Sequence, residues 1–78
     1  MEVLTHYNKS FDKIIYADKE TKNIEFENCN FTNCNFSNGL FLSSLFTNCV
    51  FTDCNLTMIK FEHCQLDNIT FKACKLLG

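Results

Sequence analysis

Residues 24 to 76 read IEFEN CNFTN CNFSN GLFLS SLFTN CVFTD CNLTM IKFEH CQLDN ITFKA CKL, in units of five. The third residue of every unit is Phe or Leu, and the first is Ile, Cys, Gly or Ser. Both sets suit a protein interior, the third residue as a bulky apolar side chain and the first as small or aliphatic filler. The other three places are mostly Asn, Thr, Glu, Asp and Lys, and no insertion or deletion interrupts the phase.

A period of five fits neither the 3.6-residue period of a helix nor the strict alternation of one long strand. It predicts short extended pieces separated by corners, with two inward residues on each piece. Asn, Asp and Ser predominate at the last place of the unit, where their short polar side chains tolerate turn conformations. Such short-period repetition is typical of an all-β solenoid, in which each repeat buries its apolar residues only by stacking on its neighbours.

The units CNFTN at residues 29–33 and CNLTM at 54–58 resemble those of the pentapeptide-repeat proteins. The pattern of that family is a small residue, Asp or Asn, Leu or Phe, and two variable polar residues. The resemblance implies a right-handed quadrilateral β-helix with four units per coil, and about three to four coils in this chain. Residues 20 apart then lie above one another. The expected interior columns are Phe26, Phe46 and Leu66; Phe31, Phe51 and Phe71; Phe36, Leu56 and Leu76; and Phe41 with Phe61.

Residues 1–23 are less regular than residues 24–78, which form the predicted repeat domain. Phe11 and Tyr16 keep the five-residue phase, so we expect an N-terminal cap and a degenerate first coil here, with these two rings under Phe31 and Phe36. Thr21 breaks the phase, and the polar residues 17–23 are expected to form a solvated loop. Val3, Leu4 and Tyr7 are candidates for a strand or a short cap.

The composition narrows the classes of partner. The net charge of −2 and the lack of a basic run argue against direct binding of nucleic acid. The N-terminus has neither the cationic start nor the apolar core of a secretory signal, and no apolar segment approaches the length of about 20 residues that spans a membrane. We therefore expect a cytoplasmic protein without a membrane segment.

Six cysteines raise the question of a metal site or of disulfides. The gap of five residues between Cys29 and Cys34 is wider than the two to four residues between ligands of typical structural zinc sites. Every cysteine falls instead at the small inward place of its unit, which favours buried free thiols; zinc and disulfides remain the alternatives. His63 falls at a corner and His6 in the irregular start, and both are expected to be surface residues.

The sequence offers no recognisable catalytic, cofactor-binding or metal-binding residues. Gly39 and Gly78 are the only glycines, so a Gly-rich phosphate loop is excluded. Glu25 and Glu27 both point outward in the proposed register, as expected of a solvated surface rather than an acid and base pair. We expect a protein that is not an enzyme and has no cofactor.

Two surface features depart from the repeat pattern. Leu40, Leu42 and Leu45 occupy outward places that are polar in other units, and form a candidate interaction patch, unless a loop or the N-terminal segment covers them. The last coil ends at Leu76 and Leu77, where an open rung invites end-to-end packing of a second copy.

Two functions follow as hypotheses. The first is a non-enzymatic scaffold or protein–protein interaction module, a homo-oligomer by end-to-end packing, whose partner protein and pathway the sequence leaves open. The second is a DNA mimic that binds a type II topoisomerase, because the units also resemble the quinolone-resistance branch of the family. Residues 24–78 carry five acidic residues against three lysines, fewer than this second function leads us to expect.

Overall fold

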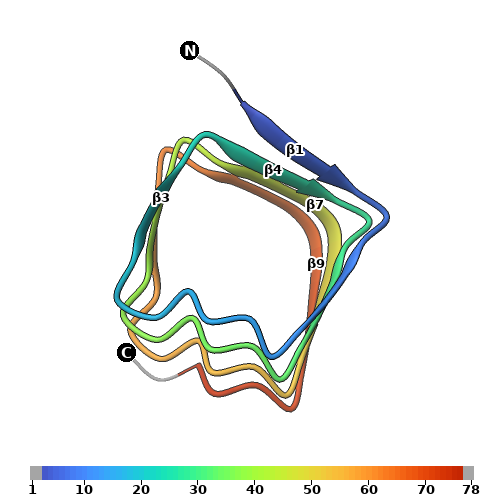
Figure 1. Cartoon of the computed structure of the whole chain (residues 1–78), viewed down its shortest axis with the longest axis vertical. Coiled ribbons are helices and arrows are strands. Elements are labelled where there is room, and N and C mark those ends of the chain that lie inside the picture. The colour runs from blue at the N-terminus through green and yellow to red at the C-terminus, as the bar shows by residue number, and fades with distance from the viewer. Residues whose placement is uncertain (1–2, 77–78) are drawn as a thin grey trace.

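The chain folds as a stack of four-sided coils, seen nearly along the axis of the stack in Figure 1. The structure is a computed structural model and describes residues 3–76. Paired residues on successive coils are 20 positions apart, as in Phe26 with Phe46 and Phe46 with Leu66. The strands are β1 (Leu4–Tyr7), β2 (Ser10–Asp12), β3 (Glu20–Lys22), β4 (Ile24–Glu27), β5 (Asn30–Thr32), β6 (Leu40–Leu42), β7 (Leu45–Thr52), β8 (Lys60–Glu62) and β9 (Gln65–Lys72).

Each side of the coil is built from one five-residue unit. The first side holds β1, β4 and the first halves of β7 and β9, and the second side holds β2, β5 and the second halves of β7 and β9. The third side has only isolated bridges, which join Ile15, Asn35, Asn55 and Lys75 in turn. The fourth side holds β3, β6 and β8. All pairings are parallel, so every coil repeats the path of the coil before it.

The corners have one backbone conformation throughout. The last residue of each unit from Asn8 to Ala73 has a φ between 51° and 60°, in the left-handed region. Asn and Asp tolerate this conformation best among residues with a side chain, which explains their frequency there. The corner amides also pair between coils: the Asn28 amide donates to the Thr47 carbonyl at 2.9 Å. The prediction of a corner at the fifth place of each unit is confirmed.

The interior is filled by the predicted aromatic columns. Phe31 and Phe51 are stacked with ring centroids 4.7 Å apart, and Phe51 and Phe71 with centroids 5.4 Å apart. Rings on adjacent sides of one coil meet edge to face, as Phe26 and Phe31 do at 79°. Offset stacks along the axis and edge contacts across it are the two arrangements that aromatic rings prefer.

The first coil is more regular than the sequence suggested. Phe11 stacks on Phe31 and Tyr16 on Phe36, as predicted. Val3 precedes β1, which contains Leu4 and Tyr7. The expected loop at residues 17–23 is wrong, because Glu20–Lys22 form β3, and Thr21 keeps the phase as the partner of Phe41. The edge of β6 opposite β8 supplies carbonyl and amide groups in register, and these hold a polar segment in strand form that the pattern alone does not predict.

The described residues form strands, bridges and turns, and none of them belongs to a helix long and apolar enough to cross a membrane.

Candidate functional site

The outer surface of the stack, rather than its interior, holds the groups available to a partner. Strand residues alternate in direction, so Phe and Cys point inward while their neighbours point outward. On β4, Phe26 is fully buried, and Glu27 is exposed. Glu25 and Glu27 therefore extend from the outer surface, as the register predicted.

The candidate leucine patch surrounds one corner. Leu40 and Leu42 lie on β6, on the fourth side, and Leu45 lies on β7, on the first side. Ser43, with a φ of 51°, forms the corner between them. All three leucines are half-buried, because charged or polar side chains of the adjacent coils stand beside them.

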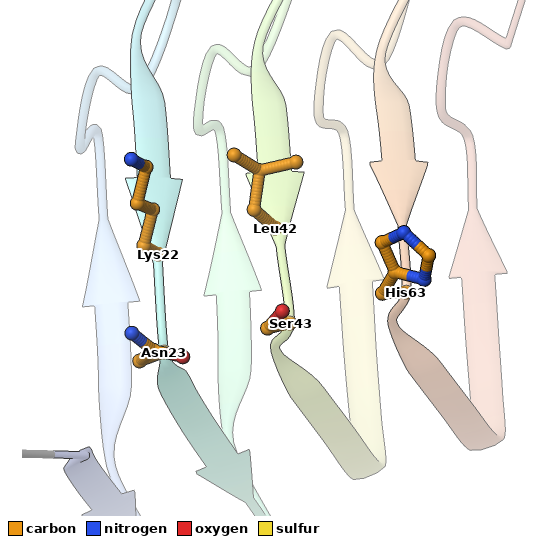
Figure 2. Close-up of a pocket in the computed structure, with 5 residues that line it drawn as sticks. All are labelled: Lys22, Asn23, Leu42, Ser43 and His63. Atoms are coloured by element: carbon orange, nitrogen blue, oxygen red, sulfur yellow. The ribbon is translucent and has the colours of Figure 1, made fainter. Parts of the chain in front are cut away.

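A groove with a volume of about 300 Å³ lies at this corner (Figure 2). It is lined by Lys22, Asn23, Leu42, Ser43 and His63. Asn23, Ser43 and His63 are the corner residues of three successive coils, and the small Ser43 side chain between two larger ones leaves the hollow. Lys22 lies 3.6 Å from the Glu20 carboxylate, and both side chains are more than half exposed.

The groove joins a leucine methyl surface to a hydroxyl, an amide, an imidazole and an ammonium group. These groups suit a peptide segment or another mixed polar and apolar surface. Of them, only Leu42 was predicted from the sequence to belong to an interaction site, and His63 was predicted only to be a surface residue. The groove was not predicted, because its residues come together from positions 20 and 40 residues apart. The signal that relates them is the phase of the repeat, which places residues 23, 43 and 63 at the same corner of successive coils.

The C-terminal end of the stack exposes inward side chains. Leu66 is 45%, Phe71 41% and Leu76 57% exposed. Their equivalents one coil earlier, Phe46, Phe51 and Leu56, are 1–3% exposed. Among residues 3–76, β8 and β9 each pair on one side only, so their outer edges carry unpaired backbone groups. Leu77, the other residue predicted for self-association, lies outside the described residues.

Charge is unevenly distributed over the four sides. The first side carries Glu25, Glu27 and Asp67, and none of the described lysines lies on it. The other three sides mix acidic residues with lysines; the fourth carries Glu20 and Glu62 with Lys19, Lys22 and Lys60. The first side is therefore the acidic surface of the molecule.

Every cysteine takes the inward first place of its unit, as predicted. Within the described residues all six are free thiols, and no group of three or more His, Cys, Asp or Glu side chains is placed to hold a metal ion. Each thiol lies near two carbonyls: the Cys54 Sγ is 3.4 Å from the carbonyl oxygens of Thr52 and Phe31. Burial raises the pKa of Cys54 to about 11 and also raises the pKa of Cys49, which keeps both thiols neutral and poorly nucleophilic.

His6 lies inside the stack, and its expected surface position is wrong. Its ring stacks on Phe26 with centroids 5.2 Å apart and meets the edge of Phe11 at 5.5 Å. The buried Nδ1 has no hydrogen-bond partner. The phase reaches back to residue 6, and this signal was available in the sequence. His63, by contrast, is exposed at its corner, as expected.

A sequence model of the family described as pentapeptide repeat region matches residues 24–78. Two solved structures of QnrB1, a plasmid-mediated fluoroquinolone resistance protein, are similar to this chain. The trypsin-treated form has a TM-score of 0.56 and 17% identity, covering 94% of this chain and 46% of the QnrB1 chain. The full-length form has a TM-score of 0.53 and 19% identity, with coverage of 90% and 47%.

The chain thus spans slightly under half the length of the QnrB1 chains. At these identities the likeness shows the fold. No curated protein matches the sequence.

Proposed function

The chain belongs to the pentapeptide-repeat family, and we propose that it is a non-enzymatic interaction module that pairs with a second copy through its C-terminal end. The outer sides then serve an as yet unidentified protein partner. The observation that carries the proposal is the exposure of Leu66, Phe71 and Leu76, whose equivalents one coil earlier are buried. Side chains and carbonyls fill the interior positions, so recognition falls to the outer surface and the ends.

The C-terminal end favours association for two reasons. Docking there removes three large apolar side chains from water, and the hydrophobic effect rewards that burial at roughly 25 cal/mol per Å². It also gives the outer edges of β8 and β9 an opportunity to pair, which a contact through side chains alone does not offer. A two-fold axis covers the C-terminal ends of both copies in one contact and limits the assembly to two copies.

The leucine patch is the weaker candidate for self-association. Leu40, Leu42 and Leu45 are already half-buried by their neighbours, so a partner gains less apolar area there. The groove beside Leu42 carries polar groups that suit a different partner. We assign this corner to the unidentified protein rather than to the second copy.

Sedimentation of point variants tests the proposed contact. We expect the wild type to sediment as a dimer, and Leu76→Lys to convert it to a monomer. Because Leu76 is more than half exposed in the single chain, a lysine there leaves the fold intact. Leu42→Lys is the matched control, since it adds the same charge at the corner and leaves the dimer in place.

A wild type that is monomeric at about tens of micromolar overturns this contact. A dimer with a dissociation constant of about 1 μM, which needs a binding free energy of only about 8 kcal/mol, is mostly associated at that concentration. Dissociation by Leu42→Lys but not by Leu76→Lys moves the contact to the leucine patch.

A second candidate function is binding to a type II topoisomerase as a DNA mimic. It is favoured by the likeness to QnrB1 and by the acidic first side, with Glu25, Glu27 and Asp67 on two strands of one sheet. If this function is correct, adding the protein to a gyrase assay changes the rate of DNA supercoiling. The change is lost in Glu27→Gln/Asp67→Asn and kept in Asp12→Asn/Glu62→Gln, which removes the same charge from the second and fourth sides. No change of supercoiling at high protein concentration rejects this function.

A further inference from the structure

The two ends of the stack differ in the character of their inward side chains. Lys9 lies over Cys29, at a place that is buried in the next two coils. Lys19 lies over Gly39, and its carbonyl accepts a hydrogen bond from the Leu40 amide at 2.9 Å. Both lysines are exposed. They are the only described charged residues at the first place of any unit, a place that Cys, Ile, Leu, Gly or Ser fills in the other described units.

The C-terminal end has no such residue. In the columns of these lysines its last members are Ile69 and Ile59, and the other inward residues of that end are Phe61, Cys64, Leu66, Phe71, Cys74 and Leu76. Every one of the described inward positions there is apolar or a thiol. At the N-terminal end, the first places of the four sides are taken in turn by Leu4, Lys9, Ile14 and Lys19, so apolar and charged residues alternate around the coil.

We propose that Lys9 and Lys19 prevent the C-terminal end of another copy from docking on the N-terminal end of the stack. The backbone permits head-to-tail joining, because every coil repeats the last and β1, β2 and β3 each pair on one side only in the described chain. Such a joint continues the parallel ladders and places β2 of one copy on the second half of β9 of the next.

That joint puts the Lys9 ammonium group in the column of Cys29, Cys49 and Ile69. A charge buried in such a column has no partner and loses its hydration, which opposes the joint. Inward-pointing charged residues protect sheet edges in the same way in other β proteins. Two N-terminal ends meeting each other also bring lysines of like charge together. Head-to-tail contacts are heterologous and do not close, so the lysines prevent growth into filaments.

The test removes these charges and keeps the length of the side chains. Lys9→Met/Lys19→Met gives chains longer than the wild-type species, with a sedimenting mass that rises with concentration. Lys22→Met/Lys72→Met is the matched control, because it removes the same net charge from outward places on the fourth and second sides. This control sediments like the wild type.

A third variant tests whether growth uses the C-terminal end. Adding Leu66→Lys to Lys9→Met/Lys19→Met charges that end and returns the variant to short species, because a growing chain needs contacts at both ends of every copy. Lys9→Ile/Lys19→Ile repeats the comparison with the residue type that Ile69 and Ile59 supply at the other end of the same columns. Circular dichroism checks that each variant is folded.

The proposal is overturned if the Met variant and the wild type sediment alike, if the outward control assembles equally, or if Leu66→Lys fails to shorten the chains. It is independent of the proposed dimer. A monomeric wild type removes the dimer, and growth of the Met variant still supports closure of the N-terminal end.

Discussion

Truncation of Phe51 to Ala tests the inward register at the middle of the stack. Phe51 is 3% exposed, and its ring lies between Phe31, at 4.7 Å, and Phe71, at 5.4 Å, with the edge of Phe36 at 5.5 Å. Removing a buried aromatic ring leaves a cavity between these neighbours and costs about 3 to 5 kcal/mol. A domain of this length has a total stability of roughly 4 to 12 kcal/mol, so the variant loses a large part of it or does not fold.

Urea unfolding followed by circular dichroism measures the effect. Thr52→Ala, at the adjacent outward place, changes the free energy of unfolding by less than about 0.5 kcal/mol. Phe71→Ala lies between the two, because that ring is already 41% exposed in the single chain. Equal losses for Phe51→Ala and Thr52→Ala refute the register, and equal losses for Phe51→Ala and Phe71→Ala show that the end of the stack is covered in solution.

Three further predictions concern the first coil, the third side and the cysteine columns. His6→Phe raises the free energy of unfolding by about 1 kcal/mol in the same urea assay, because it removes the unpaired Nδ1 and extends the stack on Phe26; a loss of stability contradicts this account. Ile15→Asn raises the free energy of unfolding by about 0.5 to 1 kcal/mol. The equivalent Asn35 accepts a hydrogen bond from the Ser37 amide at 3.0 Å, and an isoleucine side chain has no acceptor for such a bond. An unchanged urea midpoint rejects this gain. Because burial raises the pKa of Cys54 to about 11 from an ordinary 9.0, the unfolded chain loses this thiol proton first as the pH rises from about 9 to 11; the melting temperature therefore falls over that range, and falls less steeply in Cys54→Ala.

The interior and the corners can be predicted from the residue types at each place of the repeat. Phe31 and Phe51 are predicted to stack because both lie on one five-residue phase and 20 residues apart, and the structure places them so. Asn28 and Asn33 mark corners for a local reason: a short polar side chain tolerates the left-handed conformation that each unit requires. These features are carried by the residue types at each place, so a reading of the chain is enough to find them.

The repeat pattern does not predict which irregular residues join the stack or which groups the surface exposes, because both depend on how the coils pack on one another. His6, Lys9 and Thr21 have none of the expected apolar character, yet each takes an inward place, because the edge of the next coil offers backbone hydrogen bonds in register to whatever sequence lies beside it. The groove beside Ser43 arises from the relative sizes of corner residues on three coils. Local pattern reports the conformation of one unit, whereas burial, exposed ends and grooves depend on which units lie above and below it.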